Sequence, residues 1–190
     1  MISPVNFFGG IMFQLISTII AVVLVAADQI IKNWATETLT KGDITIWENV
    51  LYLKYAENTG VAFSMFADNR WILVGITALM LIAVLAFFLS GKVTDKMELF
   101  SLSLLMAGGV GNLIDRVSLG YVIDYIDVRI INFAIFNLAD ICICVGAFFL
   151  CTAVYFSDVE EKKEKEAKAK EFDDIDKDLE ALFGGENKDE

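Results

Sequence analysis

Four long runs of apolar residues dominate the chain, and shorter segments between them carry most of the polar side chains. A helix that crosses a bilayer needs about 20 mostly apolar residues. The runs therefore predict four membrane-spanning helices, at about residues 11–31, 71–90, 98–116 and 133–156. The expected fold is an all-α integral membrane protein, with its membrane domain over residues 1–157.

The first run also has a feature of a cleaved signal peptide, because the small residues Ala26 and Ala27 stand at its end. A signal peptide normally begins with a positively charged segment. No Lys or Arg precedes this run. We therefore favour a retained spanning helix over a cleaved leader.

The connection between the first two runs, about residues 33–70, is the longest of the three. Its residues 44–55 alternate in part between β-branched or aromatic and polar side chains, which predicts short strands. Trp47, Tyr52 and Tyr55 suit a membrane–water interface. We expect a small extracytoplasmic β platform on the membrane surface, with an ordinary structured loop as the alternative. Residues 118–132 are expected to form a loop between the third and fourth spans.

Charged residues are concentrated at the end of the chain, where residues 158–190 hold 14 of the 26 acidic and 7 of the 15 basic residues. Such a segment cannot bury a core, so we expect an acidic tail that is frayed helix or disordered. Lysines follow the fourth span and occupy the short loop at Lys92 and Lys96. By a narrow margin, the positive-inside rule favours cytoplasmic termini.

The absence of histidine excludes several kinds of site. A Ser-His-Asp triad, a Cys-His pair and a His-ligated zinc site are all impossible. Cys142, Cys144 and Cys151 lie in one apolar run without C-x-x-C spacing, so we interpret them as small membrane-helix residues rather than metal ligands. Acid–base chemistry must then use carboxylates, lysine, tyrosine or a thiol.

Polar residues gather at the ends of the spans that share one face of the bilayer. In an antiparallel arrangement, the ends of the first and third spans meet the start of the fourth. This face is expected to collect Asp28, Asn58, Asp115, Arg116, Asp124, Asn137 and Asp140. An ionised carboxylate within a span costs several kcal/mol. Each of these acids therefore needs a partner or a function.

Two of the acids are best explained by structural roles. Asp115 and Arg116 are adjacent opposite charges at a helix end, and the five N–H donors of Arg116 can tie loops together. Asp28 is expected at a helix C-terminus, where it opposes the helix dipole. It should therefore accept hydrogen bonds from a neighbouring segment.

The other two acids are candidates for chemistry. Asp140 is expected about two turns inside the fourth span, with Asn137 three residues earlier on the same helical face. Asp124 stands in the largely apolar stretch 121–128. Two aspartates in a low-dielectric site share a proton, so one can activate water while the other donates a proton. Structural pairing or an ion path remains open on this evidence.

Two other functions are compatible with the same residues. Asp28 and Asp140 could line the ion path of a proton-coupled transporter, although the chain has no internal repeat of the kind many transporters have. Ser64 and Lys32 could form a Ser/Lys peptidase pair, but no motif positions them. Gly108, Gly109 and Gly111 indicate close helix packing and favour neither an enzyme nor a transporter.

Five short motifs in these regions resemble those of the bacterial lipoprotein signal peptidases, or type II signal peptidases. Their order and spacing relative to four spans agree with that family over about residues 11–157. The motifs are Asp28-Gln29 with Lys32, residues 58–63 (NTGVAF), residues 108–116 (GGVGNLIDR), residues 122–125 (VIDY) and residues 136–140 (FNLAD).

The resemblance implies a specific activity. Members are metal-independent aspartic peptidases of the bacterial inner membrane. They cleave a prolipoprotein before a diacylglyceryl-modified cysteine, near the periplasmic face, and are inhibited by globomycin. The catalytic pair would be Asp124 and Asp140. The supporting or substrate-binding residues would be Asp28, Lys32, Asn58, Gly60, Asn112, Asp115, Arg116 and Asn137. We expect a monomer with no cofactor and no nucleic-acid partner. The acidic tail departs from the family pattern.

Overall fold

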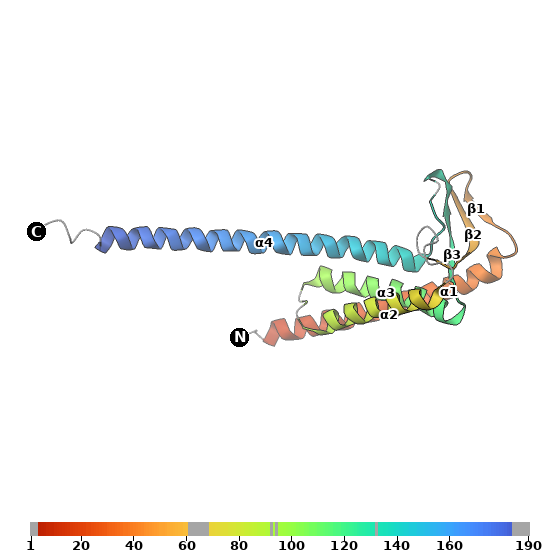
Figure 1. Cartoon of the computed structure of the whole chain (residues 1–190), viewed down its shortest axis with the longest axis horizontal. Coiled ribbons are helices and arrows are strands. Elements are labelled where there is room, and N and C mark those ends of the chain that lie inside the picture. Colours follow the sequence, from red (N-terminus) through yellow and green to blue (C-terminus); the bar gives the residue numbers. More distant parts are fainter. Residues whose placement is uncertain (1–3, 61–68, 92, 94, 132, 184–190) are drawn as a thin grey trace, which may run out of the picture. The chain divides into compact units, whose positions relative to one another are not determined.

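The computed structural model of this chain describes residues 4–60, 69–91, 93, 95–131 and 133–183. It divides into two compact units, Met1–Leu150 and Cys151–Glu190. The first unit contains three complete helices, a small sheet and the beginning of a fourth helix (Figure 1). The second unit is helical through Phe183.

Four helices of the described residues are long and apolar enough to cross a membrane. They are α1 (Pro4–Leu39), α2 (Arg70–Leu89), α3 (Lys96–Ser118) and α4 (Leu138–Phe183). In lipid, backbone N–H and C=O groups must be satisfied within the segment, so long apolar runs become helices. The prediction of a four-span integral membrane fold is confirmed.

Helix α1 continues to Leu39, about two turns beyond its expected end near residue 31. Asp28 therefore lies inside a helix, and the prediction that it stands at a helix C-terminus is wrong. The reason is a continuous buried stripe formed by Asp28, Lys32, Ala35 and Leu39, which are spaced so that they share one helical face. The two charged residues of this stripe pair with each other rather than meeting water.

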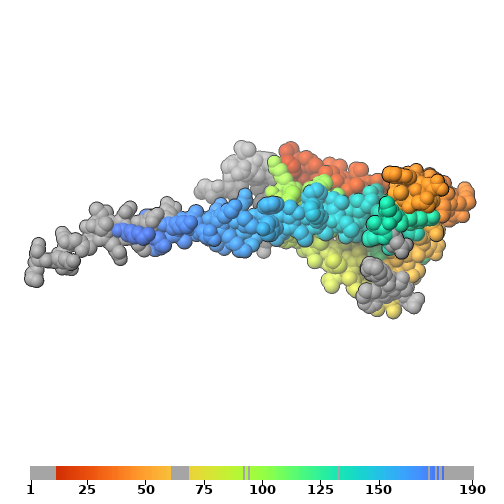
Figure 2. All heavy atoms as spheres, turned by 90° about the horizontal axis from the view of Figure 1, so that it is seen from above, coloured from red at the N-terminus to blue at the C-terminus, as the bar shows by residue number. Residues whose placement is uncertain are grey.

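A three-stranded antiparallel sheet lies at one end of the helices and runs across their axes (Figure 1). Its strands are β1 (Ile44–Trp47), β2 (Leu51–Asn58) and β3 (Val122–Val128), in the order β1-β2-β3. The short strands predicted between the first two spans are confirmed by β1 and β2. The orange and green surfaces at one end of Figure 2 are the regions of these strands.

The third strand corrects the expectation of a plain loop over residues 118–132. Both faces of this strand are largely buried, with Val122, Ile123 and Tyr125 all nearly inaccessible to solvent. Its sequence therefore lacks the alternation of apolar and polar residues that would have predicted a strand. Strand β3 pairs with β2, with Ala56 opposite Asp124. This pairing joins the connection after α1 to the connection after α3.

Helix α4 begins at Leu138, five residues later than expected. The preceding segment is extended, and Phe136 exchanges backbone hydrogen bonds with Ile126 of β3. Asp140 therefore lies in the first turn of α4, and the prediction that it lies two turns inside the span is wrong. Asn137 precedes the helix instead of sharing a helical face with Asp140.

The glycines of α3 allow close contact with its neighbours, as their clustering indicated. A Cβ on Gly108 would collide with the carbonyl oxygen of Ala139 on α4, and one on Gly109 would lie 2.8 Å from Leu81 on α2. The apolar core beneath the sheet is formed by Ala35, Leu39 and Tyr125.

The second unit is helical and mostly charged, and among its described side chains only Ala153 is buried. Its exposed ion pairs, Lys162–Asp158 and Lys165–Glu161, have i,i+4 spacing. The sequence allowed either frayed helix or disorder here, and the described residues up to Phe183 are helical.

Candidate active site

One hydrogen-bonded network lies at the sheet end of the helices and takes residues from α1, β2 and the segment after it, α3, β3 and the start of α4. It includes all ten residues that the sequence singled out: Asp28, Lys32, Asn58, Gly60, Asn112, Asp115, Arg116, Asp124, Asn137 and Asp140. The network has an ionic layer, a pair of carboxylates and a rim.

The ionic layer is centred on the buried Lys32, whose Nζ lies 2.8 Å from Asp28 Oδ2 and 2.8 Å from Asp115 Oδ2. The carboxylates also accept backbone N–H groups from other elements. Ala139 of α4 donates to Asp28 Oδ1 at 3.1 Å, and Ile123 of β3 donates to Asp115 Oδ2 at 3.2 Å. These bonds hold four elements together around one lysine.

The carboxylate pair consists of Asp124 on β3 and Asp140 on α4, and Asn137 bridges the two. The amide Nδ2 of Asn137 donates to Asp124 Oδ1 at 2.7 Å. Its backbone N–H donates to Asp140 Oδ2 at 3.1 Å. The second oxygen of Asp140 accepts the Nδ2 group of Asn112 at 2.8 Å. Asp124 is buried, whereas Asp140 is partly exposed.

The start of α4 positions Asp140 through a local capping motif. The side-chain oxygen of Asn137 accepts the backbone N–H of Asp140 at 2.9 Å, while Asp140 accepts the backbone N–H of Asn137. This reciprocal arrangement is a capping box, with Asp in place of the usual Glu or Gln. The N-terminal end of a helix also favours a negative charge. The motif therefore both begins the helix and holds the carboxylate.

The rim of the site comes from the end of β2 and from α3. Asn58 Nδ2 donates to Asp124 Oδ2 at 2.9 Å, and Asn58 Oδ1 accepts the backbone N–H of Gly60 at 3.0 Å. Arg116 donates from one terminal nitrogen to the Gly60 carbonyl at 3.1 Å. Its buried Nε has no hydrogen-bond partner in the described part of the chain. Residues 61–63 of the NTGVAF motif lie outside the described residues.

Burial sets the protonation of Asp124. Removal from water raises its pKa to about 6, since burial disfavours the charged form. The negative charge of Asp140 acts in the same direction, while hydrogen bonds from Asn58 and Asn137 and the positive charge of Lys32 oppose it. Asp124 therefore keeps its proton at a pH where an exposed aspartate has lost it.

Two further residues of the network were not singled out as site residues. Gln29 donates to Asp115 Oδ1 at 3.0 Å and to the carbonyl of Gly111 at 3.2 Å. Tyr125 accepts the backbone N–H of Leu138 at 3.2 Å through its hydroxyl oxygen, and burial raises its pKa to about 12. Gln29 stands in the Asp28-Gln29 motif and Tyr125 in the VIDY motif, each next to a candidate acid, so these motifs were the available signal.

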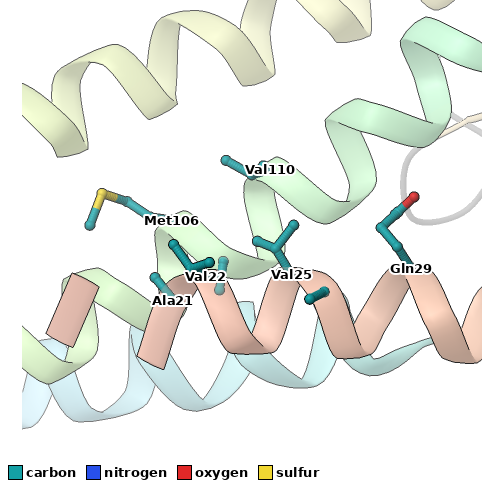
Figure 3. Close-up of a pocket in the computed structure, with 8 residues that line it drawn as sticks. Ala21, Val22, Val25, Gln29, Met106 and Val110 are labelled. Atoms are coloured by element: carbon teal, nitrogen blue, oxygen red, sulfur yellow. The ribbon is translucent and has the colours of Figure 1, made fainter. Parts of the chain in front are cut away.

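An apolar groove of about 400 Å³ lies between α1 and α3 and meets this network at Gln29 (Figure 3). Val22 and Val25 of α1 and Met106 and Val110 of α3 line it, and Gln29 stands at one end (Figure 3). Asn112 follows Val110 by two residues, which turns it about 200° around the helix axis. The groove therefore faces away from the carboxylate pair.

The geometry also bears on the other functions considered. Asp28 and Lys32 are bound to each other and to neighbouring helices, which is the arrangement of a structural ion pair. Ser64, the proposed partner of Lys32 in a Ser/Lys peptidase, lies outside the described residues. Within the described ranges, no group of three or more Cys, Asp and Glu residues is placed to hold a metal ion.

Comparisons with known proteins identify the family of the chain. The family model described as Signal peptidase (SPase) II matches residues 20–156. A lipoprotein signal peptidase of Lactococcus lactis subsp. lactis (strain IL1403) is 41% identical over 144 residues, which is 75% of this chain and 95% of the relative. Another, of Clostridioides difficile (strain 630), is 39% identical over 139 residues, or 73% and 93%.

Solved structures match as well. A bacterial membrane enzyme solved by the in meso method at 2.3 Å resolution is 32% identical, with a TM-score of 0.70, and the match covers 78% of this chain and 92% of that one. A second such structure, at 1.9 Å resolution, has a TM-score of 0.67 and the same identity, with 73% and 91% coverage. The chain therefore belongs to the signal peptidase II family of membrane proteases.

Proposed function

We propose that this protein is an aspartic endopeptidase that removes the signal peptide of prolipoproteins, cleaving before a diacylglyceryl-modified cysteine. The observation that carries the proposal is the bridging of Asp124 and Asp140 by the single residue Asn137. The substrate class is supported by the family and by the names of its curated members.

The two carboxyl groups have different surroundings and hence different roles. Asp124 is buried and keeps its proton up to a pH of about 6. Asp140 is partly exposed, and both of its oxygens accept N–H groups. We therefore assign general-base catalysis to Asp140 and general-acid catalysis to Asp124.

The reaction then balances with one water molecule. Asp140 takes a proton from water as the oxygen adds to the carbonyl carbon of the scissile peptide, and Asp124 donates its proton to the carbonyl oxygen. The resulting diol collapses when the C–N bond breaks. Asp140 gives its proton to the leaving amine nitrogen, and Asp124 recovers a proton from the diol. Both residues return to their starting states.

The rim residues can hold the substrate backbone next to this pair. Arg116 Nε is a buried donor without a partner among the described residues, so it is suited to a peptide carbonyl oxygen. Asn58 and Gly60 share a hydrogen bond beside Asp124 and form the adjacent edge of the site. A buried donor of this kind costs free energy until a ligand satisfies it.

The proposed location is the bacterial cytoplasmic (inner) membrane, with both termini in the cytoplasm and the site near the periplasmic face. Lysines after the fourth span support this orientation. A reporter enzyme that works only in the cytoplasm should be active when it is fused after residue 157. A tail that reports from the extracytoplasmic side would refute the orientation.

The decisive experiment replaces the two acids singly, by Asp124→Asn and Asp140→Asn, and measures cleavage of a diacylglyceryl-modified prolipoprotein. General acid–base groups contribute about 10²–10⁴-fold to rate, so each variant should lose at least about 10²-fold. The matched control is Asp127→Asn, because Asp127 is a neighbouring acid of β3 that pairs with Arg129 instead. Undiminished cleavage in either test variant would remove that residue from catalysis.

Two further measurements separate this mechanism from its alternatives. The proposed chemistry uses no metal, so a chelator should leave the rate unchanged, and complete inhibition by a chelator would overturn it. Globomycin should inhibit cleavage. We propose that the active species is a monomer without nucleic-acid partners, which the mass of the purified active protein–detergent complex tests.

A further inference from the structure

Lys32 is fully buried and reaches beyond the ionic layer. Besides its two aspartate partners, its Nζ donates to the side-chain oxygen of Asn112 at 3.0 Å. A lysine ammonium has three N–H donors and no acceptor. Its contacts with Asp28, Asp115 and Asn112 therefore use its full donor capacity.

This contact determines the orientation of the Asn112 amide. The two ends of an amide have nearly the same shape, but one end only accepts hydrogen bonds and the other only donates them. The Oδ1 end of Asn112 accepts from Lys32 at 3.0 Å and from Asn137 Nδ2 at 3.2 Å. The Nδ2 end donates to Asp140 Oδ1 at 2.8 Å. A flipped amide would turn its donors toward the ammonium and its oxygen toward a carboxylate.

Asp140 thus has a donor on each oxygen, one from Asn112 and one from the backbone of Asn137. If the amide were reversed, Asp140 would need a proton of its own to bond to the Asn112 oxygen. We propose that Lys32 is a positioning residue of the peptidase: by holding the Asn112 oxygen, it keeps Asp140 a carboxylate base and leaves the shared proton on Asp124. The proposal rests on the proposed function.

Other charged and titratable groups face the pair or its lysine, and none of them is substituted in this test. They come from each element packed around it: Asp28 of α1, Asp115 and Arg116 of α3, and Tyr125 of β3. Strand β2 contributes the uncharged Asn58. Loss of Lys32 would remove both the orienting donor and a positive charge near two carboxyl groups.

The test compares Lys32→Met with Lys162→Met in the full-length protein. The second variant makes the same substitution at a lysine whose side chain is 69% exposed and which also pairs with an aspartate four residues earlier. Cleavage of a diacylglyceryl-modified prolipoprotein is measured against pH, and thermal unfolding in detergent reports the folded fraction. Lys162→Met should match the unmodified protein in both measurements.

Lys32→Met should lower kcat by about 10²-fold, the effect typical of misplaced catalytic groups. It should also move the rate–pH profile to higher pH by about one unit, because loss of a nearby positive charge favours the protonated carboxyl groups. A wild-type rate, or a loss that follows the folded fraction with an unchanged profile, would overturn the proposal.

Asn112→Asp provides a reading that does not depend on the folding of the Lys32 variant. It keeps an oxygen for Lys32 and replaces the NH₂ group that faces Asp140 with a carboxyl oxygen, which can donate to Asp140 only when it carries a proton. The same upward shift of the profile is expected, and an unchanged profile would also overturn the proposal. Full activity of Asp124→Asn or Asp140→Asn would instead sink the proposed function itself, so the two failures are distinguishable.

Discussion

Two Asp–Lys pairs in this chain have the same spacing and nearly the same length but opposite surroundings. Asp28 and Lys32 on α1 are 2.8 Å apart, with side chains 2% and 1% exposed. Asp158 and Lys162 on α4 are 2.7 Å apart, with side chains 58% and 69% exposed. Each pair is an aspartate followed four residues later by a lysine on one helix.

The difference between the pairs comes from what surrounds them. An exposed pair contributes little, because either charge is well solvated when its partner is removed. A buried pair whose partner is removed leaves a charge that neither water nor protein compensates. The buried pair also contacts α3 and α4. The same sequence spacing thus gives an exposed ion pair in the tail and a buried ion pair that holds the candidate site together.

The largest difference in thermal stability between the two pairs should appear when Asp28→Ala is compared with Asp158→Ala. The first leaves Lys32 without one of its carboxylates and the N–H of Ala139 without its acceptor. Breaking a buried pair costs about 3–5 kcal/mol, so the thermal midpoint in detergent should fall clearly. Asp158→Ala should leave it unchanged. Equal shifts in the two variants would mean that burial does not separate the pairs.

A smaller effect is expected from backbone packing around the buried pair. A Cβ on Gly111 would lie 2.6 Å from Asp28 Oδ2, whereas one on Gly75 of α2 would meet nothing within 4 Å. Gly111→Ala should therefore destabilise the protein by about 1–3 kcal/mol, the usual cost of overpacking. Gly75→Ala serves as the control and should be neutral or slightly stabilising. If Gly111→Ala left the free energy of unfolding unchanged, the Asp28 side chain would have to move aside at little cost.

The pH dependence of kcat/KM should follow the titration of the buried acid Asp124 and should not depend on the exposed acid Asp158. The pKa of Asp124 is raised to about 6, so Asp124 holds its proton below that pH and loses it above. Because this proton is donated in the proposed reaction, kcat/KM should fall by about tenfold per unit as pH rises past that value. Asp158→Asn should not alter the profile. A kcat/KM that increases through pH 6 would contradict the assignment.

The smallest effect is expected from removing both exposed ion pairs, by Lys162→Gln with Lys165→Gln. Their side chains are 69% and 72% exposed, so water replaces the lost contacts. Unfolding temperature and cleavage rate should both match those of the unmodified protein. A marked loss of cleavage would indicate that the tail has a function that the buried site does not explain.

Much of the fold could be predicted from local composition. Runs of about 20 apolar residues imply spanning helices wherever they occur, and antiparallel spans place alternate ends on the same side. That reasoning was enough to bring Asp28, Asp115 and Asp140 to one end of the helices. The motif at residues 122–125 added Asp124 to the same group, and the structure joins it to Asn137.

The ends of the helices could not be predicted in the same way. Asp28 and Lys32 resemble the end of a span because isolated charges do not stay in lipid. In the folded chain they neutralise each other, and α1 continues to Leu39. Asp140 was expected deep in a span because the preceding residues are apolar, yet residues 133–136 lie outside the helix and Phe136 exchanges backbone hydrogen bonds with Ile126 of β3.

The sequence by itself determined the number of spans, the face on which the acids gather and the types of group available for catalysis, because hydrophobic length and residue type are local properties. Tertiary structure alone decided that β3 pairs with β2, although α2 and α3 separate the two strands in the chain. It also decided that Asn137 bridges two carboxylates and that Lys32 orients Asn112. These features depend on hydrogen-bond partners distant in the chain. Burial therefore decides whether an Asp–Lys pair of this spacing supports the site or lies exposed to solvent.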